Sequence, residues 1–129
     1  MDKKLLNPAG AAPPVGPYSQ GVKAKAGQII MVAGQVAFDK NGKMVGRGDV
    51  KAQTRQVMKN MEAVLKAAGA TFADVVKVNT YLTDIRDKDD VLAIRQQFFK
   101  GHKPAGTLVE VSALAFPGLM VEIEAMAIT

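Results

Sequence analysis

The sequence of 129 residues predicts a single α+β domain, residues 1–129, in which two helices cover one face of a mixed β-sheet. Short runs rich in Val and Ile predict strands, whereas two longer stretches carry apolar residues at the spacing of a helix. The order of these segments along the chain is β-β-β-α-β-α-β-β. The chain shows no internal repeat and is long enough for one hydrophobic core.

The N-terminal part is predicted to contain three strands after a proline-rich lead-in. Residues 7–17 hold four of the six prolines and therefore cannot form a helix. The strands are predicted at residues 23–26, 28–33 and 36–38. The second of these is apolar on both faces and is expected in the centre of the sheet. Gly34 then fits a bulge or a close backbone approach, and Asn41-Gly42 favours a tight hairpin turn.

The middle of the chain alternates helix and strand. Asp49 can cap a helix over residues 50–68, which Gly69 would end, and the methionines of its apolar stripe are interpreted as core residues. Residues 75–82 alternate and predict a strand. A second helix follows and ends near Lys100.

The C-terminal part is predicted to be a hairpin of two β-rich runs, residues 102–114 and 119–128, joined by a Pro-Gly turn. Neither face of the second run has the alternation of a solvent-exposed strand, so both faces are expected to be covered, one of them by another subunit. Three of the four glutamates lie here, at Glu110, Glu122 and Glu124. A carboxylate among apolar neighbours is either paired or has a raised pKa suited to proton transfer. For any one of the three, a structural role is favoured, in which the carboxylate bonds to backbone N–H groups or to a lysine across an interface.

Composition excludes several kinds of site. The chain has no cysteine, and His102 is its one imidazole, so disulfides, thiolate nucleophiles, histidine triads and cysteine-based metal centres are excluded. Four aspartates between residues 84 and 90 lack the spacing of a calcium loop and are better placed at a helix start. No metal and no cofactor are therefore expected.

Charge and hydropathy favour a cytoplasmic protein with no membrane partner. The net charge is +5, but the lysines are dispersed and aromatic residues make up only 5% of the chain, so nucleic acid is not the expected partner. No run of about 18 apolar residues could span a bilayer, and the N-terminus lacks the apolar core of a signal peptide.

Several short segments, in order along the chain, match one family. They are Gly16-Pro17-Tyr18-Ser19-Gln20, Gly34-Gln35, Ala67-Ala68-Gly69, Phe98-Phe99, Pro104-Ala105, Val109-Glu110-Val111 and Glu122-Ile123-Glu124-Ala125. On these residues the sequence resembles the Rid (YjgF/YER057c/UK114) family of RidA-like deaminases from Asn7 to the C-terminus. The resemblance implies a chorismate-mutase-like fold and a homotrimer whose sheets form a central barrel, with small-molecule clefts between subunits.

The resemblance also implies a chemistry. Active members of the family hydrolyse enamines and imines, such as 2-aminoacrylate, to a 2-keto acid and ammonia without a cofactor. By this resemblance Glu122 would position or activate the attacking water, Tyr18 would line the cleft, and backbone N–H groups near Gly34 would help to hold the ligand.

The chain departs from the family pattern at four pocket positions. An arginine that clamps the substrate carboxylate is replaced by Gly106, and small or polar residues are replaced by Ala33, Leu92 and Leu108. Each charge-assisted bond contributes about 1.5 to 3 kcal/mol, so the usual 2-imino acids are not the expected substrates. A small ligand that is more apolar or differently charged than these imino acids is expected instead.

Three functional hypotheses follow. The first is a Rid-like hydrolase of an enamine or imine, in which Arg95 or Lys103, both more simply surface residues, could substitute for the missing arginine. The alternative is a non-catalytic ligand-binding or chaperone-like trimer in which Glu122 is structural. An endoribonuclease role ranks last, because the chain offers it no histidine pair and no basic groove.

Overall fold

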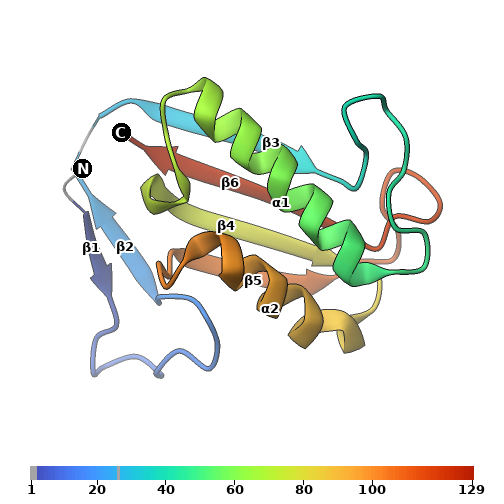
Figure 1. The fold of residues 1–129 in the computed structure, drawn as a ribbon. Coiled ribbons are helices and arrows are strands. Elements are labelled where there is room, and N and C mark those ends of the chain that lie inside the picture. The colour runs from blue at the N-terminus through green and yellow to red at the C-terminus, as the bar shows by residue number, and fades with distance from the viewer. Residues whose placement is uncertain (1–2, 26) are drawn as a thin grey trace.

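The protein is described by a computed structural model that covers residues 3–25 and 27–129. A four-stranded sheet carries two helices on one face, and a separate two-stranded sheet lies beside it (Figure 1). The elements are β1 (Lys3–Leu6), β2 (Gly21–Ala24), β3 (Ile29–Gln35), α1 (Val50–Ala67), η1 (Phe72–Asp74), β4 (Val75–Leu82), η2 (Ile85–Asp87), α2 (Lys88–Phe99), β5 (Ala105–Glu110) and β6 (Val121–Ile128).

The larger sheet is mixed, as the sequence predicted. Its strand order is β3-β6-β4-β5, with β6 antiparallel to both of its neighbours and β4 parallel to β5. Parallel strands need a long crossover, and α2 supplies it. The predicted α+β class, with two helices on one face of a mixed sheet, is therefore confirmed.

The strands in the N-terminal part include residues other than those predicted. Lys3–Leu6 forms a strand that the sequence did not predict, because its pairing with β2 is specified by tertiary contact and not by an alternating pattern. Residues 36–38 lie outside any strand, and Phe38 makes only an isolated bridge to Met44. The predicted strand 23–26 corresponds to β2, although Ala26 lies outside the described residues.

The predicted C-terminal hairpin is wrong. β4 lies between β5 and β6, and Leu82 of β4 pairs with Glu110 on one side and Val121 on the other. The Pro-Gly segment therefore connects two strands that do not pair with each other. β3 is also not central: it forms the edge of the four-stranded sheet, and its apolar outer face remains open.

The core lies between the sheet and the helices. α1 begins after Asp49, whose carboxylate accepts a hydrogen bond from the Ala52 N–H at 3.1 Å, and Gly69 follows its end with a positive φ of 74°. Both predicted core methionines, Met58 and Met61, are fully buried. No described helix is long and apolar enough to cross a membrane.

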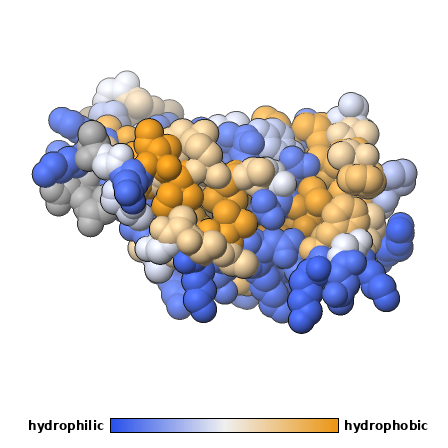
Figure 2. Space-filling view, turned by 90° about the horizontal axis from the view of Figure 1, so that it is seen from above, coloured by the Kyte–Doolittle hydropathy of each residue, from blue (hydrophilic) through white to orange (hydrophobic). Residues whose placement is uncertain are grey.

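The opposite face of the four-stranded sheet, called here the open face, carries no helix (Figure 1). Ile29 and Met31 of β3 are 64% and 69% exposed, and burial alternates along β6, with Glu122, Glu124 and its other open-face residues only half-buried. In the view from above, which shows the open face only edge-on, hydrophilic residues lie along the lower rim and hydrophobic residues lie further in (Figure 2). Apolar side chains as exposed as Ile29 and Met31 are typical of an interface.

Candidate functional site

A cavity of about 910 Å³ lies between the loop before β2, helix α2 and strand β5, and is called here the α2–β5 cavity. Its lining brings together four residues that the sequence analysis assigned to the ligand site. Tyr18 comes from the loop, Leu92 from α2, and Gly106 and Leu108 from β5. Residues far apart in sequence thus meet because α2 crosses from β4 to β5 and the loop packs against the edge of β5.

The loop that carries Tyr18 is held to β5 by its neighbour Ser19. The Ser19 hydroxyl donates to the Lys103 carbonyl at 2.6 Å, and its backbone N–H donates to the Pro104 carbonyl at 3.0 Å. Ser19 is buried and forms a parallel bridge with Ala105. The phenol of Tyr18 accepts a hydrogen bond from the Val15 N–H at 3.3 Å, so the ring is positioned within its own loop.

Gly106 permits this close approach of loop and strand. A Cβ atom built on Gly106 would lie 3.3 Å from Cβ of Tyr18 and 3.5 Å from the carbonyl oxygen of Val78. A larger residue here would require the loop to shift by a few tenths of an ångström. The glycine therefore removes a side chain from the cavity and also fixes how near Tyr18 lies to β5.

Arg95 is the charged residue buried in the wall of this cavity. Only 4% of its surface is exposed, which shows that its interpretation as a surface residue was wrong, whereas Lys103 is exposed as expected. Its Nη1 donates to Oγ1 of Thr80 at 3.0 Å and its Nη2 to the Pro17 carbonyl at 3.3 Å, and its guanidinium lies 5.8 Å from the centre of the Phe99 ring. Burial lowers the pKa of Arg95 to about 10.

Sequence analysis placed Arg95 on the surface although a signal for its burial was present. Val91 and Arg95 are four residues apart on α2, so they share the face that packs on the sheet. The partners that make burial possible are a threonine hydroxyl and a backbone carbonyl, and sequence spacing does not reveal such contacts.

The other three predicted site residues lie outside the α2–β5 cavity, where β3 and β6 pair. They are Ala33, Gly34 and Glu122. The register of β3 and β6 shifts between Val32 and Gln35, which turns Gly34 toward Glu122. A Cβ atom built on Gly34 would lie 2.8 Å from Cδ of Glu122. Only glycine at position 34 therefore leaves room for the Glu122 carboxylate. The predicted bulge or close approach at Gly34 is confirmed.

Glu124 is paired, unlike Glu122. The Tyr81 hydroxyl donates to Oε1 of Glu124 at 2.5 Å, and the Asn79 amide donates to the same oxygen at 3.0 Å. These hydrogen bonds lower the pKa of Glu124, and the bond to Glu124 raises the pKa of Tyr81. Glu124 is therefore an ionised structural partner, and no such donors reach the Glu122 carboxylate from residues 3–25 or 27–129.

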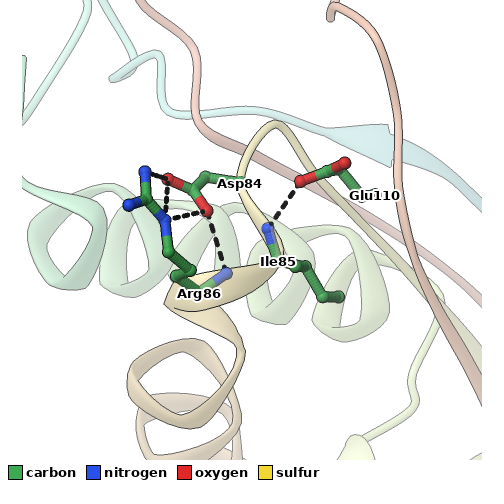
Figure 3. Close-up of polar contacts among 4 residues, drawn as sticks. All are labelled: Asp84, Ile85, Arg86 and Glu110. Atoms are coloured by element: carbon green, nitrogen blue, oxygen red, sulfur yellow. Dashed lines mark hydrogen bonds and ion pairs between the residues drawn. The ribbon is translucent and has the colours of Figure 1, made fainter.

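Glu110 and the aspartates near α2 also have structural roles. The Ile85 N–H donates to Oε1 of Glu110 at 2.9 Å, and Arg86 forms an ion pair with Asp84 at 2.7 Å (Figure 3). Asp84 also accepts from the Arg86 N–H at 2.9 Å and so caps the short helix η2. Within the described ranges, no group of three His, Cys, Asp or Glu side chains could hold a metal ion.

One chain therefore presents two separate groups of site residues. The first lines the α2–β5 cavity, on the β5 side of the sheet, whereas Ala33, Gly34 and Glu122 lie where β3 and β6 meet. Because β4 lies between β5 and β6, the sheet itself keeps the groups apart. The chain alone does not bring Glu122 to the cavity.

Comparison with known proteins gives consistent matches over the whole chain. Residues 9–129 match the family model described as Endoribonuclease L-PSP. A RutC family protein of Pyrococcus horikoshii is 43% identical, with 97% of each chain covered. The human 2-iminobutanoate/2-iminopropanoate deaminase is 38% identical, covering 98% of this chain and 90% of the human protein.

The fold agrees with these matches. The crystal structure of a conserved Rid family protein of unknown function from Yersinia pestis superposes with a TM-score of 0.92, at 39% identity and with both chains fully covered. The sequence similarity and the shared fold extend over the same residues. The chain therefore belongs to the Endoribonuclease L-PSP family, which is the Rid (YjgF/YER057c/UK114) family.

Proposed function

We propose that this protein is a homotrimeric Rid-type hydrolase that converts an enamine or imine of a small metabolite to a carbonyl compound and ammonia. The observation that carries the proposal is the division of the site: a cavity with Tyr18 in its wall, and a carboxylate at Glu122 that the same chain holds away from it. Neither group of residues alone combines the α2–β5 cavity with the Glu122 carboxylate. The similarity to a human imine deaminase supports the same reaction class.

Association through the open face would complete the site. Ile29 and Met31 expose apolar surface next to the strand that carries Glu122, so a second copy packed here gains burial of that surface. The same contact would bring Glu122 of one subunit toward the α2–β5 cavity of the next. This arrangement is a cleft between subunits, one for each pair of neighbours.

The reaction needs one water molecule and one base. Glu122 would accept a proton from water as the oxygen attacks the C=N carbon and would pass it to the nitrogen, which gives a carbinolamine. The carbinolamine hydroxyl would then lose its proton to the amino group as the C=O bond forms and the C–N bond breaks, so that ammonia leaves. The atoms balance because an imine and water give a carbonyl compound and ammonia. Gly34 leaves the carboxylate room beside the strand, and no described donor engages it as Tyr81 engages Glu124.

The substrate differs from the family's usual 2-imino acids in how it is held. Gly106 offers no side chain, so the carboxylate clamp at that position is missing, and Leu92 and Leu108 make that part of the cavity apolar. We therefore expect a ligand with a larger apolar body than 2-iminopropanoate. Leu92 and Leu108 would contact that body.

Ammonia release from freshly generated imines tests the proposal. The natural protein would be compared with Glu122→Gln on 2-iminopropanoate and on imines with longer apolar chains, at equal protein concentration. We expect turnover that rises with chain length and falls at least about 100-fold in Glu122→Gln, since a positioned base contributes about 10² to 10⁴ in rate. Equal rates in both proteins would show that Glu122 does not act on the water.

A non-catalytic ligand-binding or chaperone-like trimer is the alternative, and the loss of the arginine at position 106 favours it. In that case Glu122 serves the subunit contact. The two functions separate in one comparison: the alternative predicts ligand binding without ammonia release, and weaker assembly in Glu122→Gln.

RNA cleavage is the least supported function, although the family model bears the name endoribonuclease. His102 is the one imidazole, and its Nε2 lies 2.7 Å from the Val75 carbonyl oxygen, so it is committed to a backbone contact. Cleavage by a histidine pair is therefore excluded. The net positive charge is the remaining argument for RNA binding. Binding of single-stranded RNA that does not depend on salt concentration would remove this argument.

A further inference from the structure

We propose that Arg95 is the anion-binding residue of the α2–β5 cavity and that it anchors the carboxylate of a ligand from the α2 side. The inference deepens the proposed function, because it concerns the same cavity. Gly106 on β5 has no side chain that could bind a carboxylate, and the proposal assigns this role to Arg95 on α2.

The first argument is a buried cation without a counterion. Arg95 is 4% exposed, and buried arginines are normally paired with a carboxylate. The two hydrogen-bond partners of its guanidinium, Thr80 and Pro17, are both neutral, and within residues 3–25 and 27–129 no Asp or Glu reaches it within the 4.0 Å of an ion pair. A buried guanidinium without a carboxylate partner is stabilised most by an anionic ligand that binds beside it.

The second argument is unused donor capacity. A guanidinium has five N–H groups, and Arg95 gives one to Thr80 and one to the Pro17 carbonyl. These contacts, together with the Phe99 ring 5.8 Å away, fix the plane of the group. A fixed planar fork with free donors suits a carboxylate, which accepts two parallel hydrogen bonds.

The third argument is position. Thr80, which holds Nη1 of Arg95, pairs directly with Leu108 of β5, and Gly106 lies two residues before Leu108 on the same strand. Both β5 residues and Arg95 line the α2–β5 cavity. The guanidinium thus approaches the β4–β5 pair beside the position where no side chain projects from β5.

The rest of the lining defines the ligand class. Tyr18, Leu92 and Leu108 provide apolar surface, while Lys88 and Asp89 bring charges of opposite sign to the cavity wall. The ligand that fits is a small carboxylate with an apolar body. Burial of Arg95 keeps water from competing strongly for its donors, which strengthens the contact.

Calorimetric titration with 2-oxobutanoate and its uncharged analogue 2-oxobutanamide tests this inference. The two probes differ only in the carboxylate, so the natural protein alone is informative and no variant is needed. We expect 2-oxobutanoate to bind at least about 10-fold more tightly than the amide, as the loss of one charge-assisted hydrogen bond predicts. Equal affinities for the two probes would overturn the proposal.

Variants then locate the anion site. Arg95→Gln should lose about 10- to 100-fold in affinity for 2-oxobutanoate and little for the amide. Lys103→Gln changes the net charge equally at an exposed position and should bind both probes as the natural protein does. Equal losses of both probes in Arg95→Gln, with the fold intact by circular dichroism, would mean that the residue only supports the cavity and would refute the inference.

The same samples separate this inference from the proposed function. Carboxylate-dependent binding that requires Arg95, without ammonia release from any imine, would support the anion site and refute the hydrolase. Ammonia release at equal rates from imines with and without a carboxylate would support the hydrolase and refute the anion site.

Discussion

The carboxyl group of Glu122 occupies the space that a side chain at position 34 would need. A Cβ atom built on Gly34 would lie 2.8 Å from Cδ and 3.1 Å from Cγ of Glu122. The clash involves the end of a flexible side chain and no backbone atom, so the glutamate can move aside. Position 34 therefore controls where the carboxylate lies without determining whether the sheet forms.

Gly34→Ala should impair the reaction far more than the fold. The added methyl displaces the Glu122 carboxylate, and a misplacement of about 1 Å can cost about 100-fold in rate. The free energy of unfolding should change by less than about 1 kcal/mol. Ammonia release and urea unfolding measure the two effects, and Gly10→Ala, where a Cβ meets no atom within 4 Å, is the matched control. A variant with full activity would contradict the role of Glu122.

An arginine at position 106 should have a structural cost. Gly106→Ala adds a Cβ atom 3.3 Å from Cβ of Tyr18 and should destabilise the protein by about 1 kcal/mol, as moderate overpacking does. Gly106→Arg adds the same Cβ and a second cation to the cavity that already contains Arg95, so it should be less stable than Gly106→Ala. Urea unfolding of the three proteins measures this order. Equal stability of the two variants would show that the cations do not interact.

The bond between Tyr81 and Glu124 should make stability depend on acid. The pKa of Glu124 is lower in the folded protein than the ordinary value of 4.5, so its contribution to stability is present above pH 4.5 and is lost as the pH falls through the folded pKa. Tyr81→Phe removes the largest cause of the shift and should raise the pKa of Glu124. Carboxyl NMR titration from pH 6 to about 2.5 checks this, and an unchanged titration of Glu124 would refute the assignment.

Charge on the open face should dissociate the proposed trimer without unfolding the chain. Met31 is 69% exposed on β3, so Met31→Glu removes no core contact, yet it would place a carboxylate in an apolar interface. Sedimentation should show monomers, with near-normal circular dichroism. Val64→Glu, which changes an apolar residue on the outer side of α1, should leave the assembly intact. Identical sedimentation of all three proteins would place the subunit contact elsewhere.

Periodicity predicted the elements whose burial is local. The helix over residues 50–68 matches α1 to within one residue, and the strand 75–82 matches β4 because its residues alternate between the core and the open face. β1 was missed because four residues carry too little pattern and depend on β2 for pairing. The hairpin at the C-terminus was wrongly predicted because pairing of β6 with β4 is long-range and leaves no local signal.

The site was also predictable only in part, because the positions of its residues depend on long-range contacts. Tyr18, Leu92, Gly106 and Leu108 line one cavity of the chain, whereas Ala33, Gly34 and Glu122, which the sequence analysis assigned to the same site, lie where β3 and β6 pair. The position of Glu122 beside Gly34 follows from a register shift that the sequence marks only by a glycine. The burial of Arg95 depends on contacts with Thr80 and Pro17, and neither residue type suggests a partner for a cation.

The place of β6 between β3 and β4 has a consequence for how the chain is made. During synthesis, β3, α1 and β4 leave the ribosome before β6, yet neither β3 nor β4 pairs with the other. Until β6 arrives, both strands have an unpaired edge and α1 lacks much of the surface that it packs against. The nascent protein is therefore expected to expose aggregation-prone edges until late in translation, and a chain shortened before Val121 should be recovered mainly as aggregate.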